Sequence, residues 1–255
     1  MATEPAVLVT RPEGQAGPLC ESLARAGFQP WHQPLLELRP LSGLAGAERQ
    51  KILDLDLYQH VIFISANAVR FGMGLIEDYW PQLPAGLNWY AIGGSTARLL
   101  ADRGLEPITP GREMSSEGLL AVPSLAAVGG ERVLIIKGQG GRDTLRTQLS
   151  MRGARVDELA CYRRSCPELP PGEMGEILAG RQIQAILLSS GEGLDNLLAL
   201  LSGEETTKFK DIVLVVPSLR VENMAREAGF MQVFTAANAS DEEMMSALQQ
   251  WRCGE

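Results

Sequence analysis

Residues 7–27 read VLVTRPEGQAGPLCESLARAG, and residues 133–153 read VLIIKGQGGRDTLRTQLSMRG. Each stretch begins with an apolar run typical of a buried strand, continues through a glycine-containing loop, and ends in an amphipathic stretch that stops at a glycine. The aligned positions are 126 residues apart: Val7 with Val133, Arg11 with Lys137, Gly14 with Gly140, and Gly27 with Gly153. This constant offset predicts an internal repeat of one strand–helix unit.

A second unit repeats in the same way. VIFISANAVRFG (61–72) returns as AILLSSGEGLDN (185–196), and the segments that follow them also resemble each other. The aligned pairs are Ser65 with Ser189 at an offset of 124, and Gly104 with Gly229 and Ser115 with Ser240 at an offset of 125. The two units therefore alternate along the chain, each occurring twice.

Apolar runs that alternate with amphipathic stretches predict the fold class. The strand-like runs lie at 6–10, 60–65, 88–92, 132–137, 183–189, 211–216 and 231–234. Near-continuous apolar strands separated by helices are typical of a parallel sheet covered on both faces. We therefore predict an α/β protein with two similar domains, each a parallel sheet flanked by helices.

Two extended segments punctuated by proline, QPWHQPLLELRP (29–40) and VDELACYRRSCPELPP (156–171), are expected to cross between the domains. The residues by themselves leave two arrangements open. The first two units could form one domain and the last two the other, with a single connection. Alternatively, the outer units could pair with each other and the inner units with each other, so that the chain crosses twice.

Composition limits the function classes. The 255 residues are 45% hydrophobic and carry a net charge of -8, which argues against general nucleic-acid binding. No stretch approaches the roughly 20 apolar residues of a membrane span, and MATEPAVLVT lacks the basic flank of a signal peptide. The four cysteines have no metal-ligand spacing. We expect a monomeric cytoplasmic protein that binds neither nucleic acid nor membrane.

Loops rich in small polar residues follow the predicted strands. In open parallel sheets such loops meet at the carboxyl edge, where helix N-termini offer free N–H groups to anions. The candidate substrate-binding residues in these loops are Thr10, Arg11, Ser65, Asn67, Ser95, Thr96, Lys137, Gly138, Gly141, Arg142, Ser189, Ser190, Ser218 and Arg220. Together they suit a small molecule with several carboxylates or phosphates.

Motifs of bound cofactors are absent from the sequence. The loop beginning at Gly138 starts like a dinucleotide fingerprint, but Asp143 stands where the third glycine belongs. There is no phosphate-binding GxxxxGK(S/T) loop and no GxSxG nucleophile elbow, and His32 and His60 have no ligand spacing. We expect no cofactor and no metal.

Tyr162, in the second crossing segment, is the candidate catalytic residue, because a phenol beside the interdomain cleft could donate a proton. A half-buried packing tyrosine is the competing interpretation.

The ordered set of motifs resembles the uroporphyrinogen-III synthase family, and the resemblance spans nearly the whole chain. The segments that carry it are VLVTRP (7–12), PLLELRP (34–40), IFISANAV (62–69), AIGGSTARLLADRG (91–104), SSEGLL (115–120), VLIIKGQGGRDTL (133–145), ARVDELACYRR (154–164), ILLSSGEGL (186–194) and REAGF (226–230). The resemblance implies the double crossing. One domain would comprise 1–37 with 166–255 and the other 40–161, with 38–39 and 162–165 as the crossings.

The resemblance also implies a function. The family cyclises hydroxymethylbilane, a linear tetrapyrrole with eight carboxylates, to uroporphyrinogen III with inversion of the last pyrrole ring and loss of water, in haem and tetrapyrrole biosynthesis. Substrate lies in the cleft, held by backbone amides and small hydroxyl side chains. The family's tyrosine matches Tyr162 and its serine matches Ser65, whereas its arginine is replaced by Asn67. Of its hydroxyl pair only Ser218 is present, because Leu219 follows.

Two rival functions come from other classes. A two-domain solute-binding protein for a small polyanion has similar lobes but normally carries a signal peptide. A nucleotide-dependent oxidoreductase would need an intact glycine fingerprint.

Overall fold

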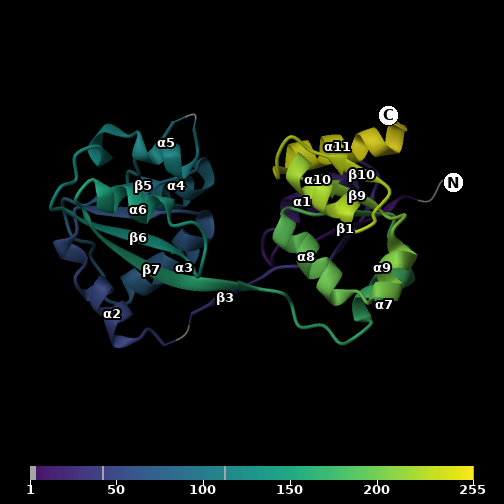
Figure 1. The fold of residues 1–255 in the computed structure, drawn as a ribbon, viewed down its shortest axis with the longest axis horizontal. Helices are drawn as coiled ribbons and strands as arrows, with labels where there is room; N and C mark the ends of the chain where they lie inside the picture. Colours follow the sequence, from purple (N-terminus) through teal and green to yellow (C-terminus); the bar gives the residue numbers. More distant parts are fainter. Residues whose placement is uncertain (1–3, 42, 112, 255) are drawn as a thin grey trace. The chain divides into compact units, whose positions relative to one another are not determined.

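The computed structural model describes residues 4–41, 43–111 and 113–254. They form two α/β units. The first combines residues 4–37 with 165–254, and the second is Leu38–Arg164, so the chain passes from one unit to the other after Glu37 and again after Arg164. In Figure 1 the purple N-terminal strand β1 accordingly lies among green and yellow elements from the end of the chain.

The first unit is built on a five-stranded sheet with the order β10-β9-β8-β1-β2. Its strands are β1 (Ala6–Val9), β2 (Gln29–His32), β8 (Ala185–Leu187), β9 (Val213–Val216) and β10 (Val233–Thr235). Its helices are α1 (Gly17–Arg25), α7 (Glu173–Gly180), α8 (Gly191–Leu200), α9 (Gly203–Phe209), α10 (Leu219–Glu227) and α11 (Asp241–Cys253). All four strand pairs are parallel.

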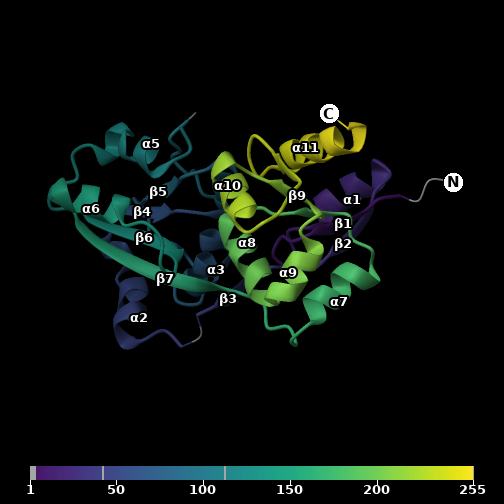
Figure 2. The same ribbon diagram turned by 45° about the vertical axis from the view of Figure 1, so that its right-hand side comes forward.

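Alternation along the strands divides the core of this unit into two layers, because successive side chains of a strand point to opposite faces. Val7 and Val9 pack with Leu19 and Leu23 of α1 and with Met244 of α11. Leu8, between them, packs with residues of α7, α8 and α10 on the other face. Figure 2 shows α1 and α11 on one side of this sheet and α8 and α9 on the other. Both faces of the sheet are therefore covered.

The second unit has a five-stranded sheet with the order β3-β7-β6-β4-β5. Its strands are β3 (Glu37–Pro40), β4 (His60–Phe63), β5 (Asn88–Ala91), β6 (Arg132–Gly138) and β7 (Arg155–Ser165). Its helices are α2 (Gly46–Leu53), η1 (Leu55–Leu57), α3 (Ala66–Glu77), α4 (Gly94–Ala101), α5 (Ser116–Leu120), η2 (Pro123–Leu125) and α6 (Thr144–Met151). The pairs β4–β5, β4–β6 and β6–β7 are parallel. The two domains of the predicted α/β class, with parallel sheets flanked by helices, are confirmed.

The internal repeat is visible in the order of the strands. The run β2-β1-β8-β9-β10 of the first sheet corresponds to β7-β6-β4-β5 of the second, followed by Ile108, which forms a parallel bridge to Tyr90 where β10 would lie. Ser65 and Ser190 both N-cap the helix after the strand, with nearly identical backbone angles. Ser190 is thus the counterpart of Ser65, and the alignment to Ser189 was wrong by one residue. Residue spacing alone does not place a strand end that closely.

The expected crossing segments are strands of the sheets. Residues 29–32 form β2, and 38–39 lie within β3, which neighbours β7. Residues 162–165, expected to connect the domains, continue β7 without a break through Ser165. Prolines and charged residues concealed these strands in the sequence, because β2, β3 and the end of β7 are only partly buried and lack a continuous apolar run.

Candidate active site

Tyr162 lies in β7 of the second unit, opposite Gly138, the last residue of β6. The register between β6 and β7 shifts between Lys137 and Gly138, and the backbone N–H of Gln139 donates to the Tyr162 carbonyl over 2.7 Å. Tyr162 is buried, with 5% of the residue exposed. A Cβ atom on Gly138 would lie only 2.7 Å from its Cζ atom, so the ring covers the glycine directly.

The hydroxyl oxygen of Tyr162 lies 3.2 Å from Oγ of Ser65. Ser65 is the N-cap of α3, and its Oγ accepts the backbone N–H of Ala68 over 3.0 Å. A hydroxyl has one proton and two lone pairs, and the capping bond occupies one lone pair. Ser65 can therefore donate its own proton to the tyrosine oxygen, which leaves the phenolic proton free for another acceptor.

Phe71 of α3 stacks on the Tyr162 ring. The two ring centroids are 5.2 Å apart, and the ring planes are inclined by 26°. Such an offset stack contributes about 0.5–1.5 kcal/mol beyond the burial of area. The phenol is therefore contacted at its hydroxyl and at its face by residues of one helix.

Cys161, which precedes the tyrosine, is a buried thiol. Its Sγ lies 3.3 Å from the carbonyl oxygen of Lys137. Burial raises the pKa of this thiol to about 12. Cys161 therefore stays protonated at neutral pH and packs as a small apolar residue.

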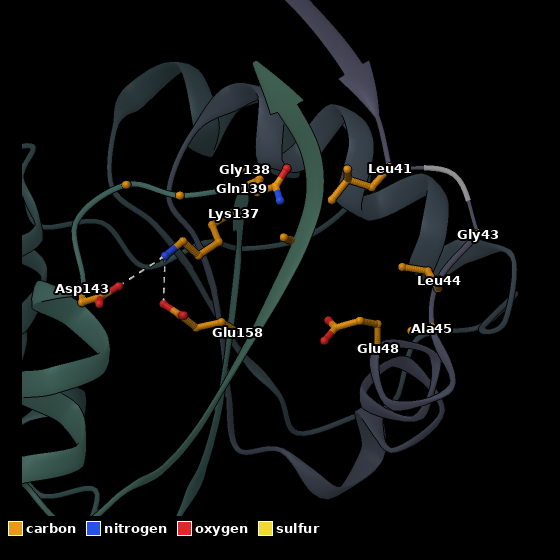
Figure 3. Close-up of a pocket in the computed structure, with 13 residues that line it drawn as sticks. Leu41, Gly43, Leu44, Ala45, Glu48, Lys137, Gly138, Gln139, Asp143 and Glu158 are labelled. Atoms are coloured by element: carbon orange, nitrogen blue, oxygen red, sulfur yellow. Dashed lines mark hydrogen bonds and ion pairs between the residues drawn. The ribbon is translucent and has the colours of Figure 1, made fainter. Parts of the chain in front are cut away.

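Lys137, a candidate cation for substrate, is buried and already paired. Its Nζ lies 3.0 Å from Oε1 of Glu158 and 3.9 Å from Oδ1 of Asp143. Figure 3 shows both carboxylates reaching the ammonium group from one side. Its charge is thus compensated within the unit.

Two cavities of the second unit share Lys137 and Glu158. The larger, about 640 Å³, is shown in Figure 3 and is lined by apolar residues of the β3–α2 region, by Glu48 and by the 137–141 loop. The smaller, about 240 Å³, is lined by Ile64, Ile92, Ser115 and Arg142, among others, where the strands of this sheet end. The larger cavity carries more carboxylates than cations, whereas the smaller one combines apolar walls with Ser115, Ser116 and Arg142.

The remaining candidates of this unit differ in exposure. Arg142 is exposed and lies 3.6 Å from a Glu117 carboxylate oxygen. Asn67 accepts from Nη1 of Arg70 over 2.9 Å. Ser95 is exposed and Thr96 is buried in the first turn of α4, which begins after Gly93 without a side-chain cap. Gly141 has φ +91°, a conformation that favours glycine.

The candidates of the first unit also lie after its strands. Thr10 is buried and donates to the Leu187 carbonyl over 2.7 Å, which ties the end of β1 to β8. Arg11 is ion-paired with Asp241 and donates to the Ala239 carbonyl over 2.7 Å. Both residues therefore stabilise the loops of this edge.

Four further candidates of this unit surround two helix N-termini. Ser189 precedes Ser190, whose Oγ accepts the N–H of Gly193 over 3.1 Å at the start of α8. Ser218 precedes α10, and its side chain makes no capping hydrogen bond. Arg220 in the first turn of α10 is exposed.

Sequence reasoning missed the partners of these residues. Phe71 had the helical spacing of an ordinary core residue, and Glu158 and Asp241 carried no motif. The only signal of Glu158 and Asp241 was a charge opposite to that of Lys137 and Arg11. Charge alone does not identify the partner, whether it lies 21 residues away, as Glu158 does from Lys137, or near the end of the chain, as Asp241 does from Arg11. Within the described ranges, no cluster of three or more His, Cys, Asp or Glu could hold a metal ion.

Fold and site together define a two-unit α/β protein whose candidate side chains follow the carboxyl ends of parallel strands, where open α/β sheets bind ligands. Residues 18–246 match the family model described as Uroporphyrinogen-III synthase HemD. The chain is 31% identical over 248 residues to the Uroporphyrinogen-III synthase of Escherichia coli (strain K12), covering 95% of this chain and 99% of that protein. It is 31% identical over 250 residues to the enzyme of the same name from Salmonella typhimurium, with 95% and 99% covered.

Solved structures share the fold. The uroporphyrinogen-III synthetase of Helicobacter pylori 26695 superimposes with a TM-score of 0.63 at 14% identity, covering 98% of this chain and 100% of that one. A mutant uroporphyrinogen III synthase of Thermus thermophilus gives 0.59 at 19% identity, with 97% of each chain covered. The chain belongs to the uroporphyrinogen-III synthase family and is an enzyme of tetrapyrrole biosynthesis. The resemblance to this family that the sequence motifs indicated is confirmed.

No described helix has the length and apolar character needed to cross a bilayer.

Proposed function

We propose that this enzyme cyclises hydroxymethylbilane to uroporphyrinogen III, with Tyr162 as the general acid. The observation that carries the proposal is the phenol of Tyr162, which is held at the end of β6 and β7 with Ser65 against its oxygen. A phenol whose oxygen accepts one hydrogen bond still has its proton to donate.

The reaction requires a proton donor, and it requires no covalent bond between substrate and enzyme. The bond between the hydroxymethyl carbon and its oxygen breaks, the oxygen takes a proton from Tyr162, and water departs. The pyrrole nitrogen lone pair supplies electrons and leaves an electrophilic azafulvene. Attack by the substituted carbon of the terminal ring gives a spiro intermediate, which fragments and closes with that ring inverted. The ring carbon that closes the macrocycle loses its proton as the pyrrole becomes aromatic again, and this proton returns to the Tyr162 phenolate. Most of the rate enhancement then comes from positioning and from charge stabilisation.

Small donors would hold the eight carboxylates. The hydroxyls of Ser189, Ser190 and Ser218 and the N–H groups at the starts of α8 and α10 are suited to carboxylates in the first unit. Ser95 and the start of α4 offer similar groups in the second unit. Arg142 and Arg220 are exposed, and the Glu117 carboxylate near Arg142 is exposed as well, whereas Arg11 and Lys137 are largely buried in their ion pairs. We assign substrate contact to Arg142 and Arg220, and loop positioning to Arg11 and Lys137.

Product analysis tests the reaction. Purified protein is supplied with hydroxymethylbilane, and the uroporphyrinogen isomers are resolved by chromatography after oxidation. We expect mainly the rearranged isomer, made equally well after treatment with a chelator and without added nucleotide. Only the unrearranged isomer, in the amount formed without protein, would contradict the proposal. Tight binding of the bilane with no turnover would instead support a solute-binding protein.

The setting of the reaction is also a proposal. We propose that the protein acts as a monomer in the cytoplasm, without contact to nucleic acid or membrane, and without metal or cofactor. Sedimentation at the concentration of the assay checks the monomer, because activity that appears only in an oligomer would overturn it.

A further inference from the structure

The ring of Tyr162 is surrounded by residues that lack a role in the chemistry. Phe71 stacks on one face at a centroid distance of 5.2 Å, and the backbone of Gly138 lies against the ring. We propose that Phe71 and Gly138 are positioning residues, which place the Tyr162 hydroxyl for proton transfer. The inference rests on the proposed function, because it concerns the group assigned there as the acid.

Helix α3 links two residues that contact the Tyr162 side chain, Ser65 and Phe71. Ser65 caps this helix and contacts the hydroxyl, and Phe71, six residues further on, contacts the ring. Gly72 packs the helix closely onto β6, since a Cβ atom there would lie 2.5 Å from the Ile136 side chain. The hydroxyl of Tyr162 is therefore positioned from a helix that is itself packed tightly against the strand bearing Gly138.

Gly138 positions the Tyr162 ring because it has no side chain. It is not among the glycines with positive φ, so alanine could adopt its backbone conformation. A Cβ atom would lie 2.7 Å from Cζ, 2.9 Å from Cε2 and 3.0 Å from the oxygen of Tyr162. All three atoms belong to the hydroxyl end of the ring. A methyl group would therefore push the reacting group away while the root of the side chain stays in place.

The proposal predicts a loss of turnover that depends on the tyrosine hydroxyl. Phe71→Leu removes the stacked ring and keeps an apolar side chain, and Gly138→Ala adds the displacing methyl group. Because a displacement of about 1 Å can cost up to about 100-fold in rate, we expect each to lower kcat on the order of tenfold. KM should change little, because Phe71 is no candidate for substrate contact and the substitution at Gly138 keeps the backbone groups through which a glycine could bind substrate. Gly74→Ala in the same helix is the control, since a Cβ atom there meets nothing within 4 Å.

A double-mutant cycle separates positioning from general damage. Phe71→Leu and Gly138→Ala are each made in the native protein and in the Tyr162→Phe background. If they act through the hydroxyl, the added loss of kcat in the Phe background should nearly vanish. Equal losses in both backgrounds would overturn the proposal, because they would show that the substitutions damage the site in another way.

A spectroscopic measurement tests placement independently of activity. The sequence has four tyrosines, so protein labelled with ¹³C at the tyrosine Cζ position gives four signals, and Tyr162→Phe assigns one of them. Phe71→Leu and Gly138→Ala should shift this signal, whereas Gly74→Ala should not. An unchanged signal in both variants would refute placement by these residues, even if the enzyme reaction is as proposed. A shifted signal with an unimpaired Tyr162→Phe enzyme would refute the acid role instead.

Discussion

The hydroxyl oxygens of Ser65 and Tyr162 lie 3.2 Å apart, although 97 residues separate them in the sequence. Ser190, the counterpart of Ser65 in the other unit, accepts the same capping hydrogen bond from the backbone N–H of the third residue after it. One copy of the repeat therefore supplies a helix cap, and the other supplies a cap that also contacts the candidate acid.

Replacing Ser65 should affect both roles of its hydroxyl. Ser65→Ala should lower the free energy of unfolding by about 1 kcal/mol through loss of the cap, and it should also lower kcat. Ser202→Ala is the matched control, because Ser202 caps α9 and lies outside the candidate site. It should lose similar stability and retain kcat. Denaturant titration and the isomer assay measure both quantities. A Ser65→Ala enzyme with full kcat would show that the Ser65 hydroxyl has no part in the mechanism.

Removing the Tyr162 hydroxyl should slow the reaction without unfolding the unit. Tyr162→Phe keeps the stack on Phe71, so the thermal midpoint should change little. We expect kcat to fall by at most about 100-fold, the low end of general acid catalysis, because the pyrrole nitrogen already assists ionisation and water can replace the acid. The rearranged isomer should still dominate. Unchanged kcat would reduce Tyr162 to packing, and mainly unrearranged product would mean that it orients the terminal ring. Tyr79→Phe, at an exposed tyrosine, is the control.

The Lys137–Glu158 pair should matter more for stability than for catalysis. The Lys137 side chain is 8% exposed, so Lys137→Met leaves Glu158 without its cation. Breaking a buried pair from one side costs about 3 kcal/mol or more, although the partly exposed carboxylate reduces this here. The double variant Lys137→Met with Glu158→Gln should recover much of the loss in a urea titration. A single variant of native stability would show that the pair is not stabilising.

Substrate binding should weaken with salt despite the net charge of -8. Exposed guanidinium groups attract carboxylates less strongly as ionic strength rises. Arg142→Ala and Arg220→Ala should each weaken the binding free energy of substrate by on the order of 1 kcal/mol, the scale of one charge-assisted hydrogen bond. This loss corresponds to a rise in KM of about fivefold. Arg25→Ala, on a helix surface away from the candidate loops, is the control. A KM that is the same at low and high salt would contradict an electrostatic site.

Alkaline pH should destabilise the second unit through Cys161. Its thiol has a pKa of about 12 in the folded protein against an ordinary 9.0, so the folded state binds this proton more tightly. The unfolded state loses the proton first, and the contribution to stability therefore falls as pH rises from about 9 toward 12. Cys161→Ala should show a shallower decline of unfolding free energy in this window than the native protein. Equal slopes would contradict the assignment. Tyr58 and Tyr90, whose pKa values burial also raises, contribute to the decline in both proteins.

Much of the fold and part of the site could be predicted from local patterns. The run at 132–137 became β6, and the serine that ends the run at 60–65 became the N-cap of α3, because apolar runs and capping residues act over a few positions. The strand at 29–32 was missed, since a partly buried strand containing proline lacks that pattern. Lys137 was identified as a cation near the site, but its burial against Glu158 was not, because spacing in the sequence does not report distance in space.

Strand runs, helix caps and motif order are local properties of the residues, and they were enough to identify this protein as a repeated α/β chain of the uroporphyrinogen-III synthase family. Local patterns left open whether β1 pairs with β8 or with β4, and the structure shows the pairing with β8 that the family resemblance implied. Only the tertiary structure shows that Arg11 is bound to Asp241 and that the Tyr162 ring contacts both Phe71 and Gly138. These relationships join residues that are far apart along the chain. They follow from the burial of whole sheets and the pairing of charges, which depend on how complete elements pack and not on any segment alone.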